Sequence, residues 1–189
     1  MTDLDTILNA VPEKIQYRNT TSKKFKSDVY NFFNKPEFKE LNCMEIGCAK
    51  GHSTFLFSKL FKQVYAINNV TIQEAQAFCS SNGSHNIEYF TQDVYKYGLP
   101  DAEVDVIMID AVHTYEAVKT DILNTLNLRS KGKKYIIFDD TGILPEVLQI
   151  VTEMCDKNVL ELITPIGCKP GDPFHRALYS DEGLICKEV

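Results

Sequence analysis

Residues 43–54 of this 189-residue chain read Cys-Met-Glu-Ile-Gly-Cys-Ala-Lys-Gly-His-Ser-Thr, and residues 64–68 read Val-Tyr-Ala-Ile-Asn. An apolar run ends near an acidic residue, two glycines follow, and an amphipathic pattern then begins. This order predicts a strand, a tight turn and a helix whose N-terminus can receive a nucleotide-like ligand. Gly47 would permit the turn, and Gly51 would let the ligand approach the backbone without a Cβ in the way.

Apolar runs and helical patterns alternate along the rest of the chain. Parallel strands are predicted at 41–46, 63–68, 86–90, 104–110 and 134–139, and helices at 22–34, 53–61, 72–80, 115–126 and 145–155. Residues 159–166 and 177–187 bracket a Gly/Pro-rich loop and predict an antiparallel pair. The alternation predicts an α/β, Rossmann-like, doubly wound sheet of seven strands that is mostly parallel and ends in this antiparallel pair.

Composition is typical of a globular protein, with 44% apolar and 24% charged residues. We expect one domain over residues 1–189, with 1–35 as a helical cover and 40–189 as the core. The net charge of −6 argues against a broad surface for nucleic acid or membrane. The basic run 23–26 is interpreted as a solvated helix face. The N-terminus lacks the pattern of a secretory signal, so a cytoplasmic protein is expected.

Six cysteines lie at positions 43, 48, 79, 155, 168 and 186, and none forms a C-x-x-C pair. Scattered cysteines in a chain of this length are typical of reduced, buried thiols rather than a disulfide framework. Their spacing also argues against a zinc site.

Polar residues end or follow each predicted parallel strand: Glu45 and Gly47, then Asn68, Asp93, Asp110, and Asp139 with Asp140. One such Asp is usually only a helix cap or a turn former. The carboxyl ends of parallel strands, however, meet at one edge of the sheet, where ligands of this fold class bind. The whole set therefore predicts a functional site at that edge.

The E-x-G-x-x-x-G spacing at Glu45 resembles motif I of class I S-adenosylmethionine-dependent methyltransferases. The resemblance implies that the loop binds the methionine part of the cofactor through Glu45, Gly47, Cys48, Ala49 and Gly51. It implies that Ser53 or Thr54 caps the next helix near the cofactor carboxylate, that Asp93 and Val94 contact the adenine, and that Asp110 borders the cofactor. Asn68 departs from the family, which usually has Asp or Glu there to accept both ribose hydroxyls.

Residues 110–121 read Asp-Ala-Val-His-Thr-Tyr-Glu-Ala-Val-Lys-Thr-Asp. They resemble the D-x-x-H-x-Y-E-x-V-x-x-D stretch of metal-dependent sugar O-methyltransferases, and catechol O-methyltransferases carry a comparable acid triad. The resemblance implies that Asp110, Asp139 and Asp140 bind Mg²⁺, that His113 is the general base, and that Asp110 is a catalytic residue together with His113. Oxygen ligands of this kind suit Mg²⁺.

The simpler interpretations stay open. His113 could only be hydrogen-bonded to Asp110, Tyr115 could be a packing residue, and Glu116 and Asp121 could be helix-surface charges. His52 is expected to face solvent, and His175 with Arg176 could clamp a substrate.

The sequence thus predicts an S-adenosylmethionine-dependent O-methyltransferase for a small hydroxylated acceptor, assisted by a divalent metal, with no nucleic-acid or membrane partner. A homodimer stays open as its assembly state. One alternative is a binding protein that keeps the fold and has lost the chemistry, which Asn68 favours. The other is an NAD-type Rossmann enzyme, against which the glycine spacing counts.

Overall fold

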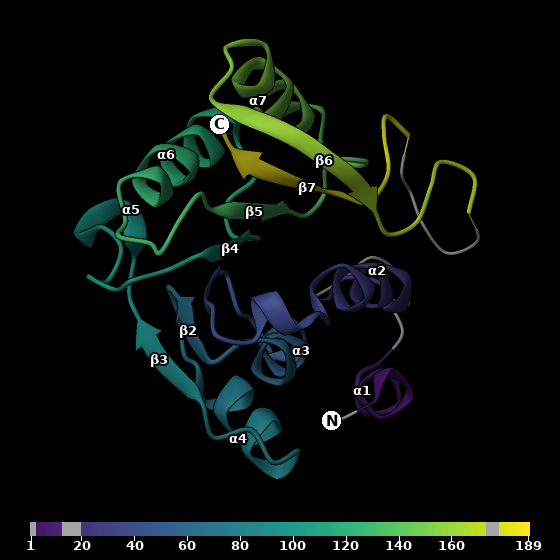
Figure 1. Ribbon diagram of the computed structural model, residues 1–189, viewed down its shortest axis with the longest axis vertical. Helices are drawn as coiled ribbons and strands as arrows, with labels where there is room; N and C mark the ends of the chain where they lie inside the picture. The colour runs from purple at the N-terminus through teal and green to yellow at the C-terminus, as the bar shows by residue number, and fades with distance from the viewer. Residues whose placement is uncertain (1–2, 13–19, 173–177) are drawn as a thin grey trace.

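The computed structural model describes residues 3–12, 20–172 and 178–189 (Figure 1). Its strands form one sheet in the order β3-β2-β1-β4-β5-β7-β6. The strands are β1 (Asn42–Ile46), β2 (Gln63–Asn68), β3 (Ile87–Thr91), β4 (Val106–Ile109), β5 (Tyr135–Phe138), β6 (Leu160–Ile166) and β7 (Gly183–Glu188). The first five pair in parallel, and β7 runs antiparallel to both β5 and β6. The predicted fold class is therefore confirmed.

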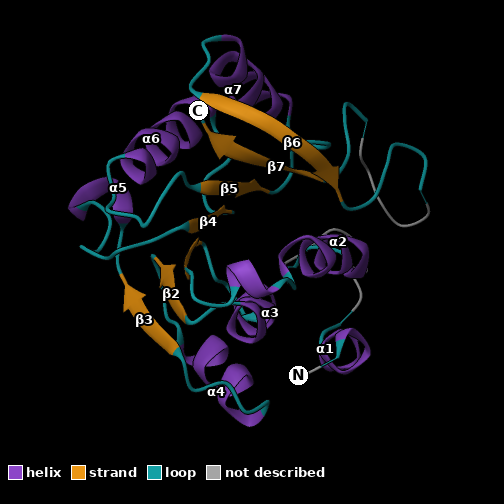
Figure 2. Ribbon diagram, in the orientation of Figure 1, coloured by secondary structure: helices purple, strands orange, loops and turns teal. Residues whose placement is uncertain are grey.

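Helices lie on both faces of the sheet (Figure 2). They are α1 (Leu4–Ala10), α2 (Lys23–Phe33), α3 (His52–Leu60), α4 (Gln73–Ser81), α5 (Val94–Tyr97), α6 (Tyr115–Leu126) and α7 (Pro145–Asp156), with a 3₁₀ turn at Pro36–Phe38. Local sequence starts several of them. Ser22 accepts the Phe25 N–H and caps α2, Thr114 caps α6 in the same way, and a proline opens α7.

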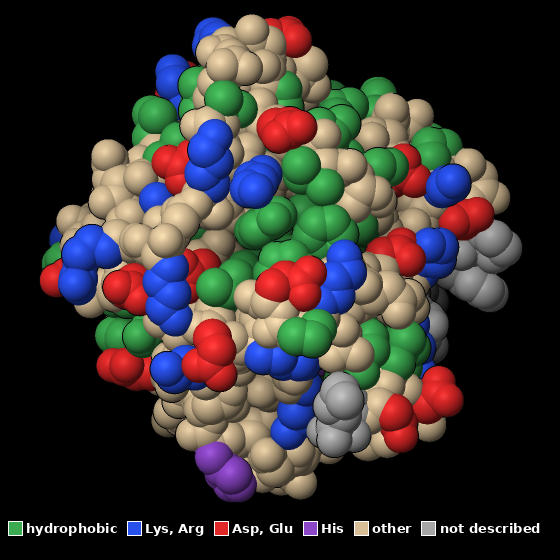
Figure 3. All heavy atoms as spheres, viewed as in Figure 1, with side chains coloured by type: hydrophobic (Ala, Val, Ile, Leu, Met, Phe, Trp, Pro, Cys, Tyr) green, Lys and Arg blue, Asp and Glu red, His purple; other side chains and the backbone are tan. Residues whose placement is uncertain are grey.

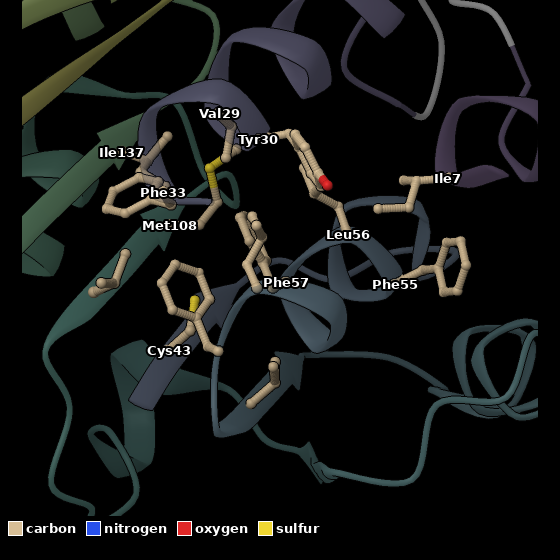
Figure 4. Close-up of a cluster of buried hydrophobic side chains, with 14 of the residues drawn as sticks. Ile7, Val29, Tyr30, Phe33, Cys43, Phe55, Leu56, Phe57, Met108 and Ile137 are labelled. Carbon is tan, nitrogen blue, oxygen red and sulfur yellow. The ribbon is translucent and has the colours of Figure 1, made fainter. Parts of the chain in front are cut away.

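The inner strands β1, β4 and β5 are buried on both faces, so their residues alternate between two cores. In β4, Val106 and Met108 join the core beneath α1, α2 and α3, whereas Ile107 and Ile109 join the core beneath α6 and α7. Figure 4 shows the first core, where Phe33 of α2 and Phe57 of α3 meet Met108 and Cys43 of the sheet. Burying one such phenylalanine contributes about 1.5–3 kcal/mol.

The N-terminal part of α2 is held to the loop between β6 and β7. The Ser22 N–H donates to Glu182 Oε1 over 2.8 Å, and the Ser22 hydroxyl donates to the other carboxylate oxygen. The Cys168 N–H also donates to Glu182, over 3.2 Å. Because Glu182 is fully buried, these bonds fix α2 close to the carboxyl edge of the sheet, where the site lies.

The expectation that the basic run 23–26 is solvated is wrong for Lys26. Its side chain is fully buried and donates to Thr21 Oγ1 over 2.6 Å and to Thr20 Oγ1 over 2.9 Å. Lys26 stands three, four and seven residues before Val29, Tyr30 and Phe33, which places it on the apolar face of α2.

Acidic and basic side chains are interspersed over the face shown in Figure 3. No helix in the described part of the chain is long and apolar enough to span a membrane. All six cysteines are free thiols, four buried and two half-buried. The reduced state expected from their spacing is thus consistent with their placement.

Candidate functional site

Two adjoining pockets open at the carboxyl edge of the sheet. The acid pocket encloses about 210 Å³ and is lined by the glycine loop and by Thr20, Ser53, Asp110, His113, Asp139 and Asp140. The asparagine pocket encloses about 200 Å³ and is lined by Asn68, Gln92, Asp93, Val94, Tyr95 and Val112. Both pockets share the walls Gly47, Ala49 and Asp110. A single elongated ligand can therefore lie across both.

Gly47 makes the shared wall possible. Its φ is +100°, and a Cβ at this position would lie 1.9 Å from the carbonyl oxygen of Asp110. Its N–H donates to the carbonyl of Ile67 in β2 over 2.9 Å. The turn after β1 is thus wedged between the ends of β2 and β4, and only glycine fits there.

Gly51 has a different role from the one expected. Its φ is +81°, and a Cβ would lie 2.9 Å from the Cα of Ala75 in α4. Gly51 lines neither pocket. It permits the close packing of α3 on α4 instead of ligand approach, so its assignment to cofactor contact is not supported by its position.

The predicted capping of α3 by Ser53 or Thr54 is wrong. The helix begins at His52 with Gly51 as its N-cap and without a side-chain cap. Thr54 is fully buried, and its hydroxyl donates to the Glu45 carboxylate. Ser53 does line the acid pocket, where its hydroxyl lies 3.3 Å from that of Thr21.

Glu45 is buried beneath the glycine loop and lines the acid pocket. Burial raises the pKa of its carboxyl to about 8, against the opposing effect of the Thr54 hydrogen bond. The charge of Asp110 raises the same pKa further, while Lys26 lowers it. Glu45 is therefore mostly protonated at neutral pH. Cys48 also lines the pocket, and burial raises the pKa of its thiol, which disfavours the reactive thiolate form.

His113 stands between two acids of the acid pocket. Its Nε2 lies 3.3 Å from Asp110 Oδ1 and 3.8 Å from Asp140 Oδ2. Burial lowers the pKa of the imidazole, but the close contact with Asp110 and the charges of Asp110, Asp140 and Asp121 outweigh it and hold this pKa above its usual range. The proximity of His113 to Asp110 expected from the sequence is confirmed.

The three acids expected to bind a metal do line one pocket. Asp139 is buried, and Asp140 adopts a left-handed backbone with φ of +58°. Within residues 3–12, 20–172 and 178–189, however, no three His, Cys, Asp or Glu side chains are arranged to hold a metal ion. The imidazole of His113 instead lies between Asp110 and Asp140. The acids as placed in the described residues do not form a metal site.

Asn68, Asp93 and Val94 lie together in the asparagine pocket. Asn68 Nδ2 donates to the Thr71 carbonyl over 3.4 Å. The Asp93 carboxylate accepts the Tyr95 N–H over 3.0 Å and so caps α5, as the simpler interpretation of a strand-end Asp predicted. Asp93 also lines the asparagine pocket.

Two expectations about exposed residues are wrong. Asp121 is fully buried and accepts the Tyr95 hydroxyl over 2.9 Å, so it is not a helix-surface charge. His52 is half-buried in the lining of the acid pocket: its Nδ1 is buried, the centroids of its ring and of the Phe78 ring lie 4.9 Å apart, and burial lowers the pKa of its imidazole to about 4. Sequence alone gave no sign of either contact.

For Tyr115 and Glu116 the structure favours the simpler interpretations. Tyr115 packs against the core beneath α6 and α7, and its hydroxyl donates to Glu153 over 2.8 Å, which favours the packing interpretation. Glu116 is exposed, as expected for a helix-surface charge. His175 and Arg176 lie outside the described residues.

Comparison with known families gives one match, to a family described as a methyltransferase domain, over residues 44–141. The match spans both glycines, His113 and the acids after β4 and β5. No curated protein matches the sequence.

Solved structures share the fold at low identity. The tRNA (m1A58) methyltransferase TrmI from Aquifex aeolicus has a TM-score of 0.67 at 14% identity, covering 99% of this chain and 76% of that one. The N-methyltransferase NodS from Bradyrhizobium japonicum, in complex with S-adenosyl-L-homocysteine, gives 0.63 at 15%, covering 98% and 95%. A SAM-dependent O-methyltransferase from Thermotoga maritima gives 0.65 at 12%, covering 98% and 70%. The acceptors of these proteins differ, so the likeness concerns the fold.

Proposed function

Because this chain belongs to the methyltransferase-domain family, we propose that it is an S-adenosylmethionine-dependent methyltransferase that methylates a hydroxyl group of a small acceptor. The observation that carries the proposal is the junction of the two pockets at Gly47, Ala49 and Asp110. One pocket suits a nucleoside, and the other brings a histidine and acids beside it. A methyl donor lying across the junction would present its reactive end to the acid pocket.

The residues present fit S-adenosylmethionine. Asn68, Asp93 and Val94 would hold its nucleoside, with Asn68 offering an acceptor and a donor to the ribose hydroxyls. The loop from Gly47 to Ala49 would hold its methionine part. When bound, this cofactor supplies an electrophilic methyl group on a sulfonium. Glu45, neutral at pH 7 and fixed by Thr54, adds little negative charge to the pocket floor.

The chemistry left to the protein is placement and proton removal. His113 would accept the proton of the acceptor hydroxyl through its imidazole, and Asp110 would hold the ring and stabilise the imidazolium that forms. General base catalysis of this kind contributes about 10²–10⁴-fold in rate. Placement of the hydroxyl in line with the methyl group supplies much of the rest.

The choice of a small hydroxylated acceptor rests on three features. A histidine next to carboxylates suits removal of a hydroxyl proton, the acid pocket is small, and the net charge of −6 disfavours a nucleic-acid acceptor. Magnesium assistance stays a prediction of the sequence. Loss of turnover with a chelator and its recovery with Mg²⁺ would support this prediction. The carboxylates of the three acids would then have to move closer together than they lie in this structure.

Calorimetric titration with S-adenosylhomocysteine tests the proposal. We expect binding with a dissociation constant in the micromolar range, about −8 kcal/mol. Gly47→Ala should abolish this binding, because the Cβ would strike the Asp110 carbonyl. Gly132→Ala is the matched control, since a Cβ there meets no atom within 4 Å. A panel of hydroxylated small molecules, followed by release of S-adenosylhomocysteine, then identifies the acceptor.

Each other outcome points elsewhere. Binding without turnover on any acceptor would favour the binding-protein alternative. Binding of NAD in place of S-adenosylhomocysteine would favour an NAD-type enzyme. Binding of neither would contradict the proposal.

A further inference from the structure

A buried carboxylate behind the asparagine pocket has no part in the proposed methyl transfer. Asp121 of α6 is fully buried, and its Oδ2 accepts the Tyr95 hydroxyl over 2.9 Å. Its Oδ1 is also buried and has no hydrogen-bond partner among the described residues. Burial raises the pKa of Asp121 to about 6, so the group is largely charged at neutral pH. A buried charge with a single partner depends strongly on that partner.

The partner, Tyr95, belongs to the pocket wall. It lies in the short helix α5 and lines the asparagine pocket together with Asn68 and Val94. Figure 1 shows α5 next to α6, so the Tyr95–Asp121 bond joins these two helices across the edge of the sheet. The ring is thereby held in one position beside the proposed nucleoside site.

Tyr95 shares its pocket wall with the segment after β4. Val112 lines the asparagine pocket beside Tyr95, and its neighbours Asp110 and His113 line the acid pocket. The ring that Asp121 holds is therefore part of the wall that borders the proposed nucleoside site.

We propose that Asp121 is a positioning residue: through Tyr95 it fixes the wall of the nucleoside site. The proposal rests on the proposed function, because it assigns the asparagine pocket to the nucleoside of the methyl donor. It adds a specific claim, that nucleoside affinity depends on a hydroxyl and a carboxylate that need not touch the reacting atoms.

Tyr95→Phe keeps the aromatic ring and removes only the hydroxyl. We expect it to weaken S-adenosylhomocysteine binding about tenfold and to speed hydrogen–deuterium exchange of α5 in the ligand-free protein. Tyr97→Phe is the matched control, because Tyr97 lies two residues on, is 66% exposed and lines neither pocket. It should match the wild type in both measurements.

Two further variants separate positioning from general stability. Asp121→Asn keeps an acceptor for the Tyr95 hydroxyl, so it should bind S-adenosylhomocysteine within about twofold of the wild type. The double variant Tyr95→Phe with Asp121→Leu removes the stranded buried charge and should recover the stability lost in Tyr95→Phe. Its ligand affinity should stay low, because the bond that ties α5 to α6 is still missing.

The outcomes are distinct. Recovery of affinity in the double variant, or equal affinity and exchange in Tyr95→Phe and Tyr97→Phe, would overturn the positioning role while leaving the proposed function intact. A wild-type protein that does not bind S-adenosylhomocysteine would overturn the proposed function. Exchange of α5 in the ligand-free protein would then still test the positioning role, and unchanged exchange in Tyr95→Phe would refute it.

Discussion

His113 Nε2 lies 3.3 Å from Asp110 Oδ1, and both residues line the acid pocket at the end of β4. Histidine stands at the third position after the strand-end acid, before Thr114 caps α6. The turn therefore folds the imidazole back over the carboxylate instead of toward solvent. A carboxylate in this position orients the ring and stabilises its charged form.

We expect His113→Gln to lower turnover of the identified acceptor by about 10²–10³-fold. Affinity for S-adenosylhomocysteine should change less than about twofold, since His113 does not line the asparagine pocket. Steady-state kinetics and calorimetry measure the two effects. His85→Gln, at an exposed histidine, is the control. Full turnover in His113→Gln would assign proton removal to another group.

Asn68→Asp tests the departure from the family pattern. A carboxylate would accept both ribose hydroxyls through charge-assisted bonds, so affinity for S-adenosylhomocysteine should rise by about 1–2 kcal/mol, roughly five- to thirtyfold. The variant gives up the weak Nδ2 bond to the Thr71 carbonyl. Asn69→Asp adds the same charge to the same pocket one residue away. Equal effects of the two variants would show that charge alone, and not ribose contact at Asn68, is responsible.

The sheet could be predicted from the sequence because its signals are local. Strands such as β4 and β5 are uninterrupted apolar runs, and α6 lies where the helical pattern and the cap Thr114 place it. The helices α1 and α5 were not predicted. They have seven and four residues, too few for a hydrophobic period to show, although Asp3 and Asp93 cap them.

The acids of the site were brought to one edge as predicted, because parallel strands share a direction. What could not be predicted depends on contacts between distant segments. The Tyr95–Asp121 bond spans 26 residues, and Gly51 packs on Ala75 of another helix. The burial of Lys26 did have a sequence signal, because Lys26 falls on the apolar face of α2. The neighbouring lysines 23 and 24 obscured it.

Lys26→Met should destabilise the fold. The ammonium is fully buried and donates to Thr20 and Thr21, and its removal leaves both without their charged donor. Loss of a buried, hydrogen-bonded charge costs about 2–4 kcal/mol. Denaturant unfolding measures this loss, with Lys133→Met at an exposed position as the control. Equal stability of the two variants would mean that packing of the methionine replaces the lost bonds.

Glu45→Gln should change how stability depends on pH. Burial raises the pKa of Glu45 from 4.5 to about 8 in the folded protein, so between these values the folded state keeps a proton that the unfolded state has released. The proton's contribution to stability is complete below about pH 4.5 and is lost as pH rises toward 8. Glutamine resembles the protonated acid at every pH and can still accept from Thr54.

The free energy of unfolding of the wild type, minus that of Glu45→Gln, should therefore fall by about 3 kcal/mol between pH 5 and pH 8. Burial lowers the pKa of His52 to about 4, so its contribution to stability rises with pH below about 6.5. His52 is present in both proteins, so this contribution cancels in the difference. Glu88→Gln, at an exposed position in β3, should show no such slope. A flat difference for Glu45→Gln would mean that Glu45 is charged in the folded protein, in which case the charge of Lys26 outweighs the effect of burial.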